Sequence, residues 1–252
     1  MLSQFQGLLL LIALLFPLLL LQRALHLEIQ AVFLLITRNP SLSIWLFSVL
    51  FFPGIFLHES SHFVTAKLLR VRTGRFSLLP RPMPGGKLQL GSVEVARSDV
   101  VRDSLIGIAP LVVGGFFIAY IAIYQMHLST LWQFLEAGQA GLFSKGITLV
   151  PRYPFFWFWF YLVFVVSSTM MPSESDRHSW LPLIEFAALL LFFALLAGAG
   201  PWMLTNLAPP LNNFFKSVSL IFALSVVLHL ILLAPALLTH KILSAVTGLD
   251  VN

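Results

Sequence analysis

The sequence predicts an all-α, polytopic membrane protein with about six transmembrane helices and one small membrane-associated β-hairpin. Of its 252 residues, 58% are hydrophobic and only 10% are charged, a balance far too apolar for a soluble domain. The apolar residues form long continuous runs rather than the alternation expected of a transmembrane β-barrel. No connection between these runs is long enough to form a separate domain, so residues 1–252 are interpreted as a single membrane-embedded unit.

Six apolar runs have a length and composition that suit membrane-spanning helices. They lie at residues 5–21, 42–66, 105–124, 154–171, 181–199 and 218–238. The first run has no Lys or Arg and no clear small-residue cleavage site after it, so we interpret it as a retained span rather than a signal peptide. The mixed segment 22–40 suggests an interfacial stretch, and residues 127–152 suggest a loop of mixed polarity.

Residues 71–97 have a different pattern. Polar and apolar side chains alternate at 87–90 and at 92–95, which is typical of strands. Three prolines and two glycines between positions 80 and 86 supply a turn. The segment therefore predicts a β-hairpin or small sheet, with a disordered basic loop as the alternative.

Eight of the fifteen Lys and Arg residues lie between positions 67 and 102. A basic loop between two spans is expected in the cytoplasm by the positive-inside rule. The patch is too short, and too closely flanked by spans, to favour nucleic-acid binding. Alternation from this loop then places both chain termini in the cytoplasm and residues 200–217 outside. The expected location is the plasma or inner membrane of a prokaryotic cell.

The most informative motif is His-Glu-Ser-Ser-His at residues 58–62, in the second half of the second apolar run. On a helix, His58 and His62 lie one turn apart on the same face and can bind one Zn²⁺, while Glu59 can act as general base on the metal-bound water. Ionisable side chains are costly in hydrocarbon, so such a cluster inside a span indicates function. A chance match at a helix end is the alternative. Pro53 precedes the motif and is expected to kink the helix.

A catalytic zinc needs a third protein ligand. Because the chain has no cysteine, that ligand must be Asp, Glu or another His. Asp176 fits best, since it follows a span end on the same expected side of the membrane and Pro172 interrupts the helix before it. Glu174 and His178 are the nearby substitutes.

These features resemble the site-2 protease family of intramembrane zinc metalloproteases. The resemblance covers about residues 42–180 and rests on HExxH within a span, on a strand segment directly after it, and on a later span that ends in a proline-containing motif with an aspartate. Ala109-Pro110 stands where the family often has Gly-Pro. The chain departs from the family at Thr169, where an Asn is usual, and at 175–177, where Ser-Asp-Arg replaces Leu-Asp-Gly.

The resemblance implies a protease that cleaves a transmembrane helix, with His58, His62 and Asp176 as zinc ligands and Glu59 as the base. The substrate, partly unwound, would pair with an edge strand that includes Leu88 and Leu90. Thr169 would hydrogen-bond the substrate backbone. The lipid bilayer and the substrate are then the expected partners, and the sequence does not predict the oligomeric state.

Within this scheme, residues 42–180 form the catalytic core and residues 1–41 and 181–252 are accessory helices. A second segment, Asn206 to Asn212, matches the family spelling of the aspartate motif but has Asn212 in place of the aspartate. It is the alternative source of the third ligand. A catalytically inactive scaffold or regulator and a metal transporter are the rival functions.

Overall fold

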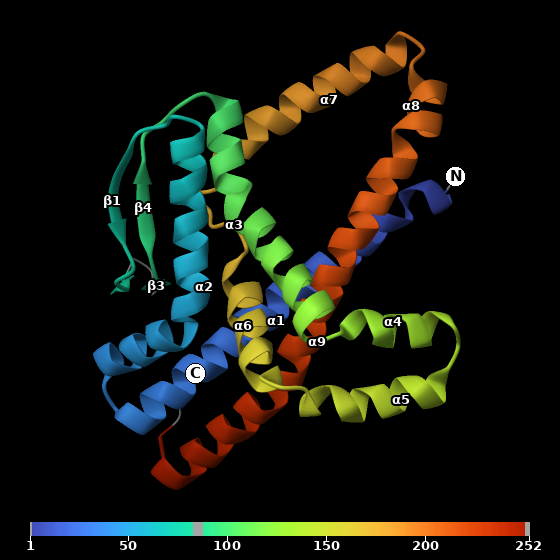
Figure 1. Ribbon diagram of the computed structural model, residues 1–252. Coiled ribbons are helices and arrows are strands. Elements are labelled where there is room, and N and C mark those ends of the chain that lie inside the picture. Colours follow the sequence, from blue (N-terminus) through green and yellow to red (C-terminus); the bar gives the residue numbers. More distant parts are fainter. Residues whose placement is uncertain (1, 83–87, 250–252) are drawn as a thin grey trace.

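A computed structural model of the chain describes residues 2–82 and 88–249 and is predominantly helical (Figure 1). Within that part of the chain, four helical segments are long and apolar enough to cross a membrane: Gln6–Thr37, Pro40–Leu68, Val100–Gln125 and Ala208–Thr247. Two bent helix pairs raise the number of candidate spans to at most six. The membrane-protein class expected from the sequence is thus supported, with a span count between four and six.

The first helix, α1 (Gln6–Thr37), follows a short 3₁₀ turn, η1 (Leu2–Phe5), and has 32 residues. It includes residues 6–21 of the predicted span and residues 22–37 of the segment 22–40 that was expected to be interfacial, so that division is wrong. The polar residues that suggested an interface make contacts within the protein instead: Gln22 is buried, and Glu28 pairs with His240. The helix ends at Arg38, which has a left-handed backbone conformation.

The second helix, α2 (Pro40–Leu68), begins where the Asn39 side chain accepts the backbone N–H groups of Ser41 and Leu42. Pro40 occupies the first turn, where its missing N–H costs nothing. The helix contains Pro53 and changes direction along its length (Figure 1), as expected for an internal proline. Its final third contains the motif 58–62.

The segment after α2 forms strands, as predicted, and not a disordered loop. Strand β1 (Thr73–Ser77) pairs antiparallel with β4 (Ser92–Val95), and β2 (Arg81–Pro82) pairs antiparallel with β3 (Leu88–Gln89). The predicted turn residues at 84–86 lie outside the described residues. Both β1 and β4 contact α2, and the sheet lies alongside it (Figure 1).

The third span is α3 (Val100–Tyr120), extended by a π-helical turn, η3 (Ile121–Gln125). The predicted loop 127–152 is instead largely helical, with α4 (Leu128–Glu136), α5 (Ala140–Leu149) and a 3₁₀ turn, η4 (Val150–Arg152). Here α4 and α5 pack on one another, with the Leu131 side chain against Gly146. In this region the mixture of polar and apolar residues belongs to amphipathic helices and not to an irregular loop.

The fourth predicted span is the 14-residue helix α6 (Phe156–Thr169), set at 96° to the helical segment before it. A helix of that length extends about 21 Å, whereas the hydrocarbon core of a bilayer is about 30 Å thick. Helix α6 is therefore too short to cross alone. The irregular segment 170–179 follows it, and such backbone is tolerated at membrane depth only where protein or a cavity surrounds it.

The fifth predicted span is α7 (Trp180–Leu196), followed at an angle of 113° by α8 (Gly200–Asn206). The last helix, α9 (Ala208–Thr247), has 40 residues and so begins well before the predicted span 218–238. The stretch 200–217, expected to be a loop, is thus mostly helical. Its prolines lie in the first turns of α8 and α9, where they start helices rather than break them.

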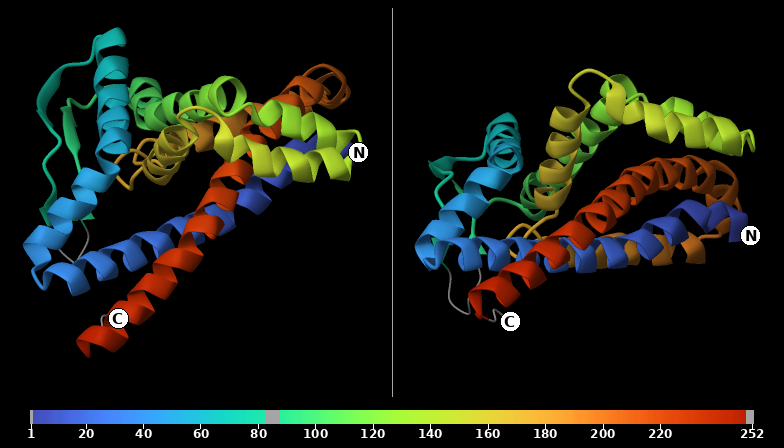
Figure 2. Two further views of the ribbon diagram at one scale, coloured as in Figure 1. Left: turned by 60° about the horizontal axis from the view of Figure 1, so that its bottom comes forward. Right: turned by 90° about the horizontal axis from the view of Figure 1, so that it is seen from below.

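Helices α1 and α9 lie side by side and run in the same direction (Figure 2). Near their starts, the Gly7 N–H donates to Asn212 and the Ser219 hydroxyl donates to the Gly7 carbonyl; near their ends, Glu28 meets His240. The parallel direction of α1 and α9 differs from the antiparallel direction expected for the first and last of six alternating spans.

Candidate metal centre

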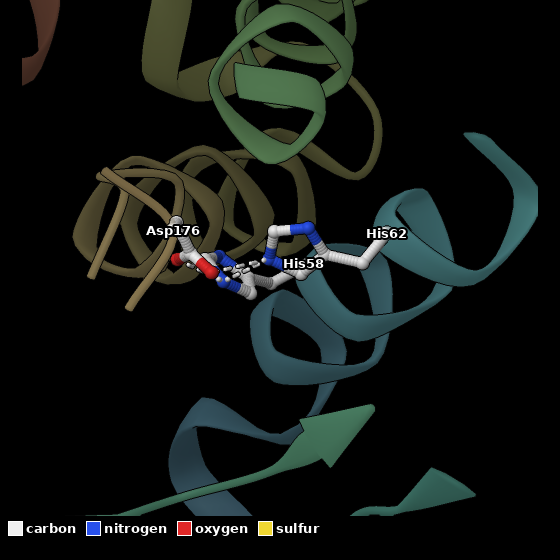
Figure 3. Close-up of side chains that lie close together, drawn as sticks. All are labelled: His58, His62 and Asp176. Carbon is white, nitrogen blue, oxygen red and sulfur yellow. Dashed lines mark hydrogen bonds and ion pairs between the residues drawn. The ribbon is translucent and has the colours of Figure 1, made fainter. Parts of the chain in front are cut away.

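His58 and His62 project from the same face of α2 toward Asp176, which lies in the segment after α6 (Figure 3). The two histidine Nε2 atoms are 3.2 Å apart. Asp176 Oδ2 lies 3.7 Å from Nε2 of His58, and its Oδ1 lies 3.3 Å from Nε2 of His62. The structure thus brings together the three residues that the sequence proposed as metal ligands, across a separation of more than a hundred residues.

The three side chains lie close enough together to bind one metal ion. With bonds of about 2.0–2.2 Å to nitrogen and oxygen, tetrahedral Zn²⁺ holds its ligand atoms about 3.3–3.6 Å apart. The two Nε2 atoms are 3.2 Å apart, and each lies 3.3 or 3.7 Å from a different oxygen of Asp176. With one donor atom per residue, all three donors lie within 4.8 Å of one another. Three protein ligands leave the fourth position open, which is the pattern of catalytic rather than structural zinc sites. The group can therefore hold a metal ion.

The histidine rings are oriented by backbone carbonyls. Nδ1 of His58 donates to the carbonyl oxygen of Thr169 over 2.6 Å, and Nδ1 of His62 donates to that of Ile106 over 2.8 Å. Because a carbonyl oxygen can only accept, the proton of each ring is on Nδ1 and its Nε2 lone pair is available to a metal. Such contacts fix the tautomer and orientation of metal-binding histidines.

Asp176 lies in a turn that begins after Pro172. Its Oδ2 accepts the N–H of Ser173 over 2.7 Å, and its own N–H donates to the Ser173 hydroxyl over 3.3 Å. Burial alone would raise the pKa of the Asp176 carboxyl, but the adjacent imidazoles of His58 and His62 and the hydrogen bond from Ser173 outweigh it and hold that pKa well below its usual range. Asp176 is therefore present as a carboxylate, the form that binds metals.

Three contacts hold the Asp176 turn against the start of α3. The Ser104 hydroxyl donates to the Ser179 carbonyl, His178 lies 3.6 Å from Asp103, and the Asp176 backbone carbonyl packs directly on Gly107. A Cβ at position 107 would overlap that carbonyl, so only glycine permits this approach. Helix α3 thereby fixes the position of the Asp176 carboxylate relative to the two histidines.

The alternative third ligands lie elsewhere. His178 donates through Nδ1 to the Ser175 carbonyl and turns its other nitrogen toward Asp103. Glu174 is exposed and does not belong to the cluster. Asn212 is buried in α9, where its side chain accepts the Gly7 N–H over 2.7 Å. The geometry favours Asp176 over all three.

Glu59 is only 8% exposed, although it adjoins His58 on α2. The turn between β3 and β4 covers it: a Cβ added to Gly91 would lie 2.8 Å from Glu59 Cγ and 2.9 Å from Oε1. This close approach requires a glycine. The carboxyl of Glu59 is consequently enclosed between α2 and the strand segment.

The residues predicted to bind substrate are differently placed. The Thr169 hydroxyl donates to the Val165 carbonyl of its own helix, and the Thr169 carbonyl accepts from His58. Leu90 is half-buried and packs against the hydrophobic core. Leu88 lies in β3, but its side chain lies outside the described residues. A substrate-binding role for these three residues stays a prediction.

Sequence reasoning missed the parts of the site that are backbone or glycine. Every residue has a backbone carbonyl, so the identities of Ile106 and Thr169 do not reveal that their carbonyls accept hydrogen bonds from the histidines. Gly91 and Gly107 were visible as residues, but a single glycine does not identify what approaches it. The three consecutive hydroxyl residues at 167–169 were the available signal that the end of α6 makes hydrogen bonds within the protein.

Comparison of the chain with protein-family models, with curated proteins and with solved structures found no match. The chemical interpretation of the site therefore rests on its own geometry, together with the motif resemblance described above.

Proposed function

We propose that this protein is a membrane-embedded zinc metalloprotease that hydrolyses peptide bonds within or near transmembrane helices. The observation that supports this most is the clustering of His58, His62 and Asp176, whose donor atoms lie within 4.8 Å of one another. The enclosed carboxyl of Glu59 lies beside them, and both histidines are on a helix apolar enough to span a bilayer. A metal site of three ligands and an adjacent glutamate is the arrangement that zinc peptidases use.

The residues divide the chemistry between them. Zinc, when bound, lowers the pKa of a coordinated water to about 7 and polarises the scissile carbonyl. Glu59 takes a proton from the attacking water as the new C–O bond forms, and returns it to the leaving nitrogen as the C–N bond breaks. The carbonyls of Thr169 and Ile106 keep both imidazoles in the binding orientation throughout.

The proposed substrate is a transmembrane helix that unwinds locally. An intact helix hides its peptide groups in its own hydrogen bonds, so the cleaved segment must become extended first. The strands beside α2 offer a partner for such a segment by β-augmentation, and the turn after β3 already reaches Glu59. Residues that weaken helices near the cleavage site are expected to favour hydrolysis.

The site is proposed to face the cytoplasm. The strand segment and the adjoining helix ends present exposed basic side chains at positions 67, 70, 72, 75, 81, 97 and 102. By the positive-inside rule, this end of α2 is the cytoplasmic one. Water would then reach the metal from that side.

The test is a measurement of bound zinc per chain in the purified full-length protein, by elemental mass spectrometry. We expect near-stoichiometric zinc in the wild type and in Asn212→Ala, and its loss in Asp176→Ala. Loss of zinc in Asn212→Ala, with zinc retained in Asp176→Ala, would mean that the third ligand lies in α9 and would contradict the site described here.

Cleavage is then assayed on a single-span model substrate reconstituted in the same bilayer, with Glu59→Gln as the matched variant. Glu59→Gln is expected to retain zinc and to lose about 10²–10⁴-fold in rate, the usual contribution of a general base. A wild type that binds no zinc when the metal is supplied would favour the rival function, a catalytically inactive scaffold.

A further inference from the structure

Helix α6 ends inside the helix bundle, where its last carbonyl groups cannot be hydrated. Ser167 is fully buried and Ser168 is 7% exposed. The last four carbonyls of any helix lack partners within it, and an unpaired buried carbonyl is costly. The carbonyls of this final turn must therefore find donors on other elements.

Two of those donors come from different helices. The Ser167 carbonyl accepts the side-chain amide of Gln22, on α1, over 2.6 Å. Two residues later, the Thr169 carbonyl accepts Nδ1 of the metal-ligand candidate His58, also over 2.6 Å. Gln22 is itself only 6% exposed. A buried amide of α1 and a histidine of the metal site thus bind the same helical turn.

A third contact reaches this turn from α9. His229 is fully buried, and its Nδ1 donates to the Ser225 carbonyl over 2.7 Å. Its Nε2 is therefore the unprotonated nitrogen, and the Ser168 hydroxyl, 3.0 Å away, donates to it. The edge of the Phe164 ring packs against the same imidazole. Ser168 is consequently held to α9 by a hydrogen bond of defined direction.

We propose that Gln22 and His229 are positioning residues for the metal centre, acting through the last turn of α6. This inference rests on the proposed metal site. The final turn of α6 positions the Thr169 carbonyl, which orients His58. It also positions the start of the segment that leads to Asp176. If Gln22 or His229 is lost, Ser167 or Ser168 must find another partner, and the turn shifts with it. The helices first interpreted as accessory thereby contribute to the geometry of the ligands.

The test compares zinc dissociation constants, from competition with a chromogenic chelator, in purified full-length protein. Gln22→Met keeps the side-chain volume but removes the amide donor, and His229→Ala removes the acceptor for Ser168. Contacts that orient metal ligands change affinity about 10–100-fold when removed, and we expect about tenfold weaker binding in each variant. His229→Gln, which restores an oxygen acceptor near the position of Nε2, should recover most of the affinity.

The matched control is His240→Ala, which breaks another polar contact between α9 and α1, the 2.6 Å pair of His240 with Glu28. That contact does not involve α6, so zinc affinity should equal that of the wild type. Thermal unfolding of the metal-free proteins shows whether each variant is folded. If His229→Ala does not fold, Ser168→Ala, which removes only one oxygen, replaces it.

Two results would overturn the inference. Wild-type affinity in Gln22→Met and in the variant that breaks the Ser168–His229 contact would show that the turn needs neither helix. Equal weakening in His240→Ala would show that α1–α9 packing in general, rather than the α6 contacts, matters. A wild type that binds no zinc would instead remove the proposed function, and this inference with it, so the two failures are distinguishable.

Discussion

Helices α6 and α7 are consecutive, similarly apolar and similar in length, yet they have opposite surroundings. Seven of the 14 residues of α6 are buried, whereas none of the 17 residues of α7 is. The C-terminal turns of α6 contain three hydroxyl residues, Ser167, Ser168 and Thr169. The Ser168 hydroxyl bonds to α9, and the other two hydroxyls bond to their own helix. The backbone carbonyl of Ser167 accepts a hydrogen bond from α1. The sequence of α7 offers mainly Leu, Phe and Ala.

The contrast shows what decides packing in this protein. Apolar side chains gain little by leaving lipid for protein, because both surroundings are equally apolar. Small and hydrogen-bonding residues, by contrast, gain partners only within the protein. Helix α6 ends in three small hydroxyl residues and is enclosed; α7 has no Ser or Thr and extends away from the bundle (Figure 1).

The largest expected effect comes from removing a metal-ligand candidate, compared with removing an acidic residue of α7. His62→Ala should abolish stoichiometric zinc, because the remaining two donors cannot hold the ion in a three-ligand site. Glu185→Ala, which removes the one acidic residue of α7, should leave zinc unchanged, since Glu185 is exposed and outside the cluster. Elemental analysis of both purified variants is the measurement. Zinc loss in Glu185→Ala would mean that α7 approaches the metal.

A second prediction concerns Gly107, against which the Asp176 carbonyl packs. Gly107→Ala places a methyl group on the Asp176 carbonyl, so the turn must move and zinc affinity should fall about tenfold, as for other changes that misplace a ligand. Gly115→Ala on the same helix is the control, because its Cβ would meet only the Ile221 side chain at 3.8 Å. Chelator competition distinguishes them; equal affinities would show that the turn adjusts without displacing the carboxylate.

The third prediction compares two phenylalanines in α6 and α7. Phe164 is 7% exposed and packs against Phe51 and His229, whereas Phe192 is 55% exposed. Phe164→Ala should leave a cavity that costs about 3 kcal/mol of stability, while Phe192→Ala should change stability by less than about 0.5 kcal/mol. Unfolding in mixed micelles with a graded denaturing detergent measures both. Equal destabilisation would mean that α7 is packed against protein in the bilayer.

The smallest expected effect lies at the helix starts. Asp99 accepts the N–H groups of Val101 and Arg102 at the start of α3, whereas α7 begins without a side-chain cap. The backbone hydrogen bond from Arg102, together with its guanidinium, holds the pKa of Asp99 below its usual range.

A lowered pKa stabilises the folded protein above the ordinary aspartate pKa of about 3.9, and the contribution disappears as the pH falls through the folded value. Asp99→Ala should therefore lower the melting temperature slightly at pH 7, and the difference should vanish in strong acid. Thermal scans at the two pH values test this, with Ser98→Ala as a neighbouring control. A difference that persists in acid would indicate that the carboxylate charge is not involved.

Local sequence signals determined the membrane class, the strand segment after α2 and the group His58, Glu59 and His62. Each depends on neighbours within a few residues: the length of an apolar run, alternation with a period of two, and a spacing of four on a helix. Such patterns act before any tertiary contact forms, and the structure retains all of them.

Only the tertiary structure decided which distant residues meet. It favoured Asp176 over Asn212, joined the expected interfacial segment 22–40 to the first helix, and set α1 parallel to α9. It also brought Gln22 and His229 to the last turn of α6, whose Thr169 carbonyl contacts His58. A polar residue in an apolar run must find a partner, but its sequence does not say on which helix that partner lies, because the choice depends on how all the helices pack at once.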